Sequence, residues 1–211
     1  GILKVGFELS ADPAYVHTEG ATASTEEALT FGVVTMTPAS IKKWITISDE
    51  ALDLGGEEFL YYIYDELTYQ IAKKAQSELI AKITALTASA TTEAVGVGVV
   101  AGTPSVGIVA SAIGALSDEA ANPVLVMNKG TWAQFKAAQY AGNFDVDPFE
   151  GLDVVFNNSL TAYSAATTGV TYMIVGDLGH GALANFPGGS DEITIKRDDY
   201  TLATSDLVRF I

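Results

Sequence analysis

The chain has 211 residues, of which 48% are hydrophobic and 18% charged, so it can bury a core and is not a disordered protein. Its formal net charge is −15, and its few basic residues do not cluster as a phosphate-binding surface requires, which argues against direct nucleic-acid binding. The chain has no cysteine, which excludes disulfides, zinc–thiolate sites and thiol nucleophiles.

The first part of the chain is an acidic arm, because residues 5–41 contain acids but neither lysine nor arginine. Tyr15–Thr18 and Leu29–Val33 have the β-branched and aromatic content of strands, and the small polar segment Glu19–Thr25 separates them. These runs predict a long β-hairpin. Two strands alone are marginally stable in water, so we expect the hairpin to rest on another surface.

A strand and a long helix are predicted next. Ile41–Ser48 is rich in isoleucine and predicts the strand, and Ser48 offers an N-cap oxygen ahead of two acids, which indicates a helix start. Gly55–Gly56 is expected to break this first short helix. Glu57–Leu86 then predicts a helix about 45 Å long.

The long helix carries one apolar stripe. Its members recur at spacings of three or four: Leu60, Ile63, Leu67, Ile71, Ala75, Leu79, Ile83 and Leu86. Most steps are four residues rather than 3.6, so the stripe is expected to curl around the helix axis and to touch more than one surface. Four tyrosines surround the stripe, and core packing and subunit contact are the two interpretations of them: Tyr61, Tyr62, Tyr64 and Tyr69.

The middle of the chain predicts a compact α+β unit. Val106–Leu116 is expected to form a short helix and Pro123–Asn128 a buried strand. Thr131 is expected to cap a helix that runs through Tyr140 and ends at Gly142–Asn143. The remaining β-like runs are Leu152–Phe156, Tyr172–Val175, Gly181–Phe186, Glu192–Lys196 and Leu207–Ile211, with turns at Pro187–Gly189 and Asp198–Asp199.

Catalytic chemistry has little support. His17 and His180 are the two side chains that titrate near neutral pH. His17 lies in the arm, and His180 lies in Gly176–Gly181, which is expected to be a turn between strands. Asp177 and a serine would complete a triad with His180, but no Gly-x-Ser-x-Gly elbow presents that serine. We therefore expect no catalytic residue and no enzymatic activity.

Cofactor, metal and membrane signals are equally weak. The glycine cluster at 96–102 lacks the strand–helix frame of a dinucleotide site. Asp145, Asp147 and Glu150 would supply oxygen ligands for calcium, but they lack the spacing of a calcium loop, which favours a solvated loop. Glycines and a proline interrupt the apolar stretch Val95–Leu116, which argues against a membrane helix. We expect no cofactor and no metal.

In this order, the segments resemble the major capsid proteins of tailed bacteriophages, the Hong Kong ninety-seven fold. In that family an arm and an extended hairpin loop precede a long spine helix in a peripheral domain; an axial domain follows, and the chain returns to peripheral strands. Residues 1–40 resemble the arm and loop, Ile41–Ser48 the leading strand, and Glu57–Leu86 the spine helix. The other motifs that carry the resemblance are Val124–Asn128, Thr131–Tyr140, Gly151–Val155 and Val175–Leu178.

The resemblance implies four regions: the arm and loop at 1–40, the peripheral domain at 41–103, the axial domain at 104–175, and the return to peripheral strands at 176–211, which is expected to be incomplete at the C-terminus. It implies a structural shell protein of the virion that assembles in the host cytoplasm as pentamers and hexamers and encloses DNA without sequence-specific binding. Scaffold, maturation protease, portal and decoration proteins are the further partners it implies, and Gly1 fits removal of a scaffolding segment.

One departure from the family matters. Some members weld the shell through a lysine in the extended loop, and residues 5–41 contain no lysine. Burial and hydrogen bonding, or a cement protein, are therefore expected to hold the shell together. Two alternatives stay open: an encapsulin-like nanocompartment shell with the same fold, and a secreted Ala/Thr/Gly-rich surface-layer module, a monomeric β protein without the long helix.

Overall fold

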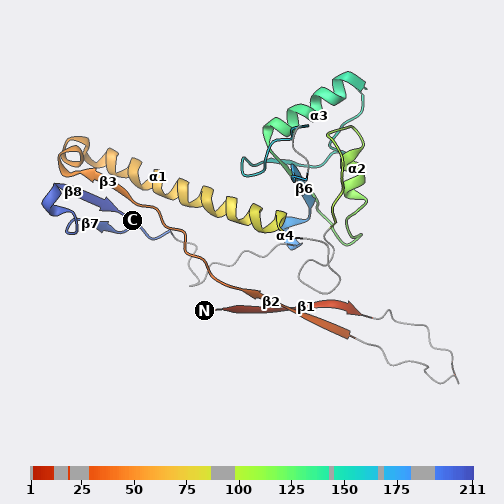
Figure 1. The fold of residues 1–211 in the computed structure, drawn as a ribbon, viewed down its shortest axis with the longest axis horizontal. Helices are drawn as coiled ribbons and strands as arrows, with labels where there is room; N and C mark the ends of the chain where they lie inside the picture. Colours follow the sequence, from red (N-terminus) through yellow and green to blue (C-terminus); the bar gives the residue numbers. More distant parts are fainter. Residues whose placement is uncertain are drawn as a thin grey trace. The chain divides into compact units, whose positions relative to one another are not determined.

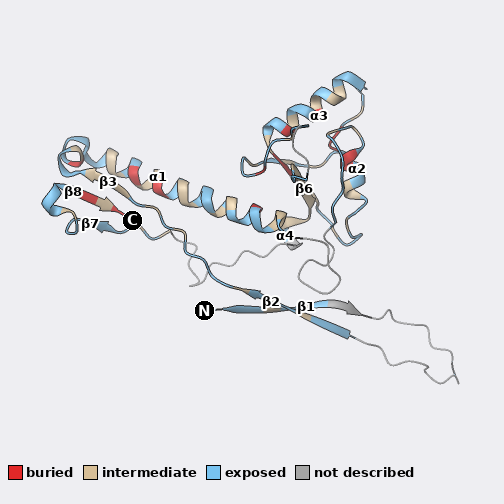
Figure 2. Cartoon of the chain, viewed as in Figure 1, coloured by how far each residue is buried: buried red, intermediate tan, exposed pale blue. Residues whose placement is uncertain are grey.

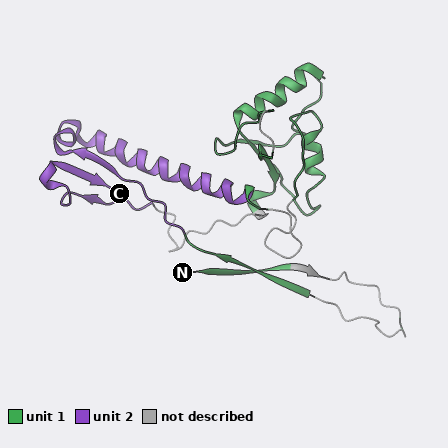
Figure 3. Ribbon diagram, viewed as in Figure 1, with its two compact units in different colours: residues 1–38, 84–183 green, residues 39–83, 184–211 purple. Residues whose placement is uncertain are grey.

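The computed structural model divides into two compact units (Figure 3). Unit 1 comprises Gly1–Pro38 and Thr84–Leu183, and unit 2 comprises Ala39–Ile83 and Ala184–Ile211. The residues that the structure describes are 2–11, 19, 29–86, 98–142, 145–165, 169–181 and 193–211. Each unit is thus built from segments that are distant in the sequence.

The N-terminal hairpin of unit 1 pairs β1 (Leu3–Ala11) with β2 (Leu29–Met36) in antiparallel register, with a bulge between Glu8 and Ser10. The second strand was predicted at Leu29–Val33 and extends to Met36. The first strand was predicted at Tyr15–Thr18, which lies outside the described residues; the strand that pairs with β2 is Leu3–Ala11. The alternation of Leu3, Val5 and Phe7 with Lys4, Gly6 and Glu8 is the period-two signal that marks it.

Unit 2 contains a three-stranded antiparallel sheet in the order β3 (Ile45–Ser48), β8 (Leu207–Phe210), β7 (Arg197–Asp198), packed on α1 (Asp49–Thr84), with a 3-10 turn at Ala203–Ser205 (Figure 1). The strand predicted to begin at Ile41 begins at Ile45, because its partner β8 ends opposite that residue, at Phe210. The strand predicted over Glu192–Lys196 is also wrong for its described part: strand geometry starts at Arg197, although Lys196 and Ile211 exchange two backbone hydrogen bonds of 2.9 Å.

The start of α1 follows the predicted signals. The Ser48 Oγ accepts a hydrogen bond from the Ala51 N–H at 3.3 Å, as an N-cap does. Gly56 has φ 62° and ψ −160°, a backbone conformation that is almost restricted to glycine, and it kinks the helix. The break at Gly55–Gly56 is therefore confirmed, and the longer segment ends at Thr84, two residues before the predicted Leu86.

The core of unit 2 lies between α1 and the sheet. Leu52, Ile63 and Leu67 pack against Val208 and Phe210, and all five side chains are buried. Figure 2 shows buried positions on α1 and β8. Four-residue steps advance about 40° beyond a full helical turn, so Leu79, four steps after Ile63, lies about 160° around the axis. Leu79 is accordingly 40% exposed, and the predicted curl of the stripe is confirmed.

The rest of unit 1 is an α+β assembly. Its three-stranded sheet has the order β5 (Val154–Phe156), β4 (Val124–Met127), β6 (Met173–Gly176), in which β5 is parallel and β6 antiparallel to β4. The helices are α2 (Ile108–Ile113), α3 (Lys129–Gly142) and the short α4 (Leu178–Gly181). The core combines Ile108, Val109, Leu125, Met127, Phe135 and Phe149.

Two local expectations in unit 1 are wrong. Thr131 does not cap α3, because the helix begins two residues earlier and the Asn128 Oδ1 accepts the Gly130 N–H at 2.8 Å. Thr131 is fully buried, and its Oγ1 accepts a hydrogen bond from the Tyr163 N–H at 3.0 Å. The segment Leu178–Gly181, expected as a turn and the start of a strand, forms the helical turn α4; the remainder of the predicted strand, 182–186, lies outside the described residues.

Candidate functional site

The described side chains of the N-terminal hairpin are those of residues 3–8 and 29–36, and none of them is buried (Figure 2). Residues that are directly opposite in an antiparallel pair share a face, so one face carries Leu3, Val5, Phe7, Gly32, Val34 and Met36. The opposite face carries Phe31 and Val33, which are 66% and 60% exposed. Both faces of this two-stranded ribbon therefore present apolar side chains to their surroundings.

The sheet of unit 2 has one covered face and one open face. Val208 and Phe210 point to α1, so the intervening Arg209, opposite Thr46 and Asp198, lies on the other face. The Arg209 Nε atom is buried, yet it has no hydrogen-bond partner among the described residues. Beside this face, Trp44 is 64% exposed.

The tyrosines of α1 divide between the two interpretations. The Tyr64 ring meets the Phe210 ring edge-on, with centroids 5.8 Å apart and an interplanar angle of 77°, so its role is core packing. Tyr61, Tyr62 and Tyr69 are 61%, 64% and 59% exposed, so they are not core residues. They remain candidates for contact with another subunit.

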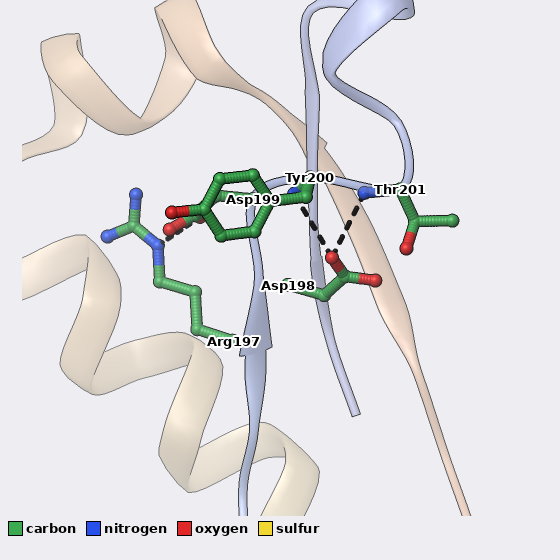
Figure 4. Close-up of polar contacts among 5 residues, drawn as sticks. All are labelled: Arg197, Asp198, Asp199, Tyr200 and Thr201. Atoms are coloured by element: carbon green, nitrogen blue, oxygen red, sulfur yellow. Dashed lines mark hydrogen bonds and ion pairs between the residues drawn. The ribbon is translucent and has the colours of Figure 1, made fainter.

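The turn after β7 is fixed by carboxylates (Figure 4). The Asp198 Oδ1 accepts hydrogen bonds from the N–H groups of Tyr200 and Thr201 at 3.1 and 3.0 Å. Hydrogen bonding from the Thr201 hydroxyl, and from these two N–H groups, lowers the pKa of Asp198 below its ordinary 3.8. Arg197 pairs with Asp199, which raises the pKa of the guanidinium above its usual value. These charges stabilise a turn and form no reactive cluster.

The residues considered for catalysis are not brought together by the described part of the chain. His17 lies outside it, and for His180 only the backbone is described, within α4. The Asp177 Oδ2 accepts a hydrogen bond from the Asn122 N–H at 3.3 Å, so this carboxylate ties the segment before β4 to the end of β6. The sequence pointed to no particular serine as the nucleophile of a triad, and these contacts bring none to Asp177.

The calcium candidate is a structural turn. The two Asp147 carboxylate oxygens accept hydrogen bonds from the N–H groups of Phe149 and Gly151, at 3.2 and 3.1 Å. Glu150 and Gly151 have positive φ angles of 53° and 74°, which the turn requires. Within the described ranges, no group of three or more histidines or acids is placed to hold a metal ion.

The glycine cluster and the apolar stretch show no site either. Described residues 98–107 contain no strand ahead of α2, so the frame of a dinucleotide site is missing there. Gly102 instead allows a close approach, because a Cβ atom at this position would lie 2.3 Å from Ile108 Cδ1. No helix in the described part of the chain is both long enough and apolar enough to span a membrane.

The sequence interpretation missed a cluster of lysines and aromatic rings around α3. Lys129 Nζ lies 5.6 Å from the Phe156 ring centroid, and Lys136 Nζ lies 4.9 Å from that of Phe149 and 6.0 Å from that of Trp132. The spacing Lys129, Trp132, Lys136 places three side chains on one helix face and is the signal that would have found it. Phe31 and Val33 of the hairpin were predicted to lie in a strand, but the sequence did not predict that their side chains would be exposed.

The fold and its surfaces define an α+β protein with apolar side chains left open for other molecules. The family model described as the Phage capsid family matches residues 4–211. The chain therefore belongs to the phage capsid family and is a structural shell protein of a phage-like particle, which confirms the resemblance in the sequence. Shell proteins of this family associate with copies of themselves and are components of the particle.

The fold has a solved relative. A chain from the capsid of a native GTA particle, solved with C5 symmetry, matches with a TM-score of 0.63 at 16% sequence identity, over 99% of this chain and 77% of that chain. At this identity the likeness concerns the fold, and it confirms the α+β capsid architecture. The length of α1 contradicts the all-β surface-layer alternative. No curated protein matches the chain.

Proposed function

We propose that copies of this chain assemble as pentamers and hexamers into a closed icosahedral shell around the DNA of a tailed phage or prophage. Residues 1–40 would serve as arm and extended loop, 41–103 with 176–211 as the peripheral domain, and 104–175 as the axial domain. The role is mechanical and needs no catalytic step. Family membership and the capsid-like fold support this assignment.

The hairpin is the observation that carries the proposal. A two-stranded ribbon is marginally stable in water, and this one presents Phe31 and Val33 at 66% and 60% exposure on one face and an apolar row on the other. Covering a large apolar side chain contributes about 1–2 kcal/mol. The hairpin therefore gains most when it lies across an adjacent subunit, and the same contact repeats for every copy in a shell.

The charge of the chain fits the contents of such a shell. A formal charge of −15 per copy repels polyphosphate, so packed DNA would not adhere to the inner wall. Because residues 5–41 contain no lysine, the arm supplies no amine for a covalent weld there, and burial and hydrogen bonding, or a cement protein, would hold the shell. Assembly in the host cytoplasm, with scaffold, maturation protease, portal and decoration proteins as partners, completes the proposal.

Electron microscopy and analytical ultracentrifugation of the purified chain test the proposal. We expect closed particles or five- and six-membered rings above a threshold concentration, and DNA inside particles recovered from cells. A compact, heat-resistant monomer at all concentrations would refute the proposal. Particles filled with a cargo protein instead of DNA would favour the nanocompartment alternative.

A further inference from the structure

The sheet of unit 1 has an acidic end. Asp118 and Glu119 precede β4, and Asp153 directly precedes β5, which is parallel to β4. Asp177 directly follows β6, which is antiparallel to β4, and its Oδ2 accepts the Asn122 N–H at 3.3 Å. The strand directions place Asp153 and Asp177 at the end where β4 begins, and Asp118 and Glu119 lie in the segment that leads through Asn122 into this end. We call these four acids the acidic end.

A row of cations on aromatic rings begins at the opposite end of the sheet and follows α3. Lys129 follows β4, and its Nζ lies 5.6 Å from the centroid of Phe156, the last residue of β5. Trp132, one turn along α3, stacks on Phe149 at 6.5 Å and meets Phe156 edge-on at 6.3 Å. Lys136 Nζ lies 4.9 Å from the Phe149 centroid. Lys129, Trp132, Lys136, Phe149 and Phe156 form what we call the basic aromatic patch.

The two ammonium groups of this patch have no carboxylate partner in the described part of the chain. Lys129 contacts a ring, and Lys136 contacts rings and donates to the Gln139 Oε1 at 3.0 Å. They are the only basic residues of segment 98–181, which has many acids: Asp118, Glu119, Asp145, Asp147, Glu150, Asp153 and Asp177. Next to them, the edge strand β5 exposes Val155 and Phe156 at 47% and 46%. Unpaired cations beside exposed apolar side chains suit an anionic protein surface.

Copies of a chain with charge −15 repel one another, so contacts that bring opposite charges together favour their association. A rotational ring uses heterologous contacts, in which one surface of a copy meets a different surface of the next. The acidic end and the Lys129–Phe156 part of the basic aromatic patch lie at opposite ends of one sheet and have opposite charge. We propose that, around each ring, the basic aromatic patch of one copy receives the acidic end of the next, a contact that rests on the proposed shell function.

Nucleic acid is the less suitable occupant of the patch. Binding a phosphate backbone takes clustered lysines and arginines, and this segment has two lysines among many acids. The acids would repel phosphates that approach the neighbouring surface, whereas they complete the contact between copies.

Charge reversal tests the contact. Lys129→Glu and Glu119→Lys should each raise the threshold concentration for assembly about fivefold at low salt, because each places like charges together across every ring contact. The double variant restores opposite charges in exchanged positions and should return to within about twofold of the wild type. Lys129→Arg, the matched control, keeps the charge and the ring contact and should assemble as the wild type does.

Salt and folding measurements complete the experiment. At about 1 M salt the screening length falls to about 3 Å, so Lys129→Glu and the wild type should have the same threshold concentration for assembly. Far-ultraviolet circular dichroism of the subunits should be identical for all variants, since the exchanged side chains are exposed.

The outcomes separate this contact from the proposed function. If the wild type forms no rings or particles, the shell function itself fails. If the wild type assembles and Lys129→Glu assembles equally well, or the double variant assembles no better than the single ones, the contact is refuted. Normal assembly of Lys129→Glu with loss of retained DNA would assign the patch to nucleic acid and also overturn the proposal.

Discussion

Phe210 and Phe31 are the same side chain in opposite environments, and replacing each by alanine should separate folding from assembly. Phe210 is fully buried in unit 2, where it contacts Tyr64 edge-on and packs with Leu52, Ile63 and Leu67. Phe31 lies on the hairpin and is 66% exposed. The chemical change is identical, so a difference in outcome reports the environment.

The magnitudes follow from burial. Removing a fully buried phenylalanine costs about 3–5 kcal/mol, since it loses apolar burial and leaves a cavity. Phe31 keeps roughly a third of its surface covered in the free subunit, so Phe31→Ala should lower subunit stability by about 1 kcal/mol or less. On assembly, however, Phe31→Ala forfeits the burial that an adjacent subunit supplies, and its threshold concentration should rise about tenfold.

Urea unfolding of dissociated subunits, followed by far-ultraviolet circular dichroism, measures subunit stability, because α1 dominates the helical signal of unit 2. Light scattering as a function of protein concentration measures the threshold concentration for assembly. The reasoning is refuted if Phe210→Ala unfolds at the same urea concentration as the wild type. It is also refuted if Phe31→Ala destabilises the free subunit as much as Phe210→Ala does.

Three further predictions concern single contacts. Gly56→Ala should cost about 2 kcal/mol in urea unfolding, because φ 62° with ψ −160° is strained for any residue with a Cβ, whereas the control Gly142→Ala should be near neutral. Thr131→Val keeps the shape but leaves the Tyr163 N–H unpaired, so it should cost about 1–3 kcal/mol, and Thr131→Ser, which keeps the acceptor, should cost less; equal losses would contradict this role. The pKa of Asp198 is lowered on folding, so its charge stabilises the native state above pH 3.8 and ceases to do so as pH falls through the lowered value. The stability gap between wild type and Asp198→Asn should therefore be widest near neutral pH and close in acid, as urea midpoints across pH will show.

Several elements could be predicted from the sequence because their signals are local. The Ser48 cap, the break at Gly56 and the drift of the α1 stripe depend on residues within a few turns of one another. The strand at Val124–Met127 is an apolar run, and the strand at Leu207–Phe210 is apolar except for Arg209. The order of these segments was enough to indicate the capsid family.

The tertiary structure decided what depends on distant partners. Thr131 has the sequence of a cap, yet it is a buried acceptor because Tyr163, 32 residues away, donates to it. Tyr64 is a core residue and Tyr61 is exposed, although they are one turn apart, because only Tyr64 faces Phe210 from the far end of the chain.

The candidate site shows the same division. Composition established a strongly acidic chain with few lysines. Which end of a sheet is acidic and which carries Lys129 on the Phe156 ring depends on β5 being parallel and β6 antiparallel to β4. Strand direction is set by long-range pairing and crossover connections, which leave no periodic trace in the residues themselves. The sequence by itself therefore determined the elements and the family, and the pairing of distant segments determined the surfaces.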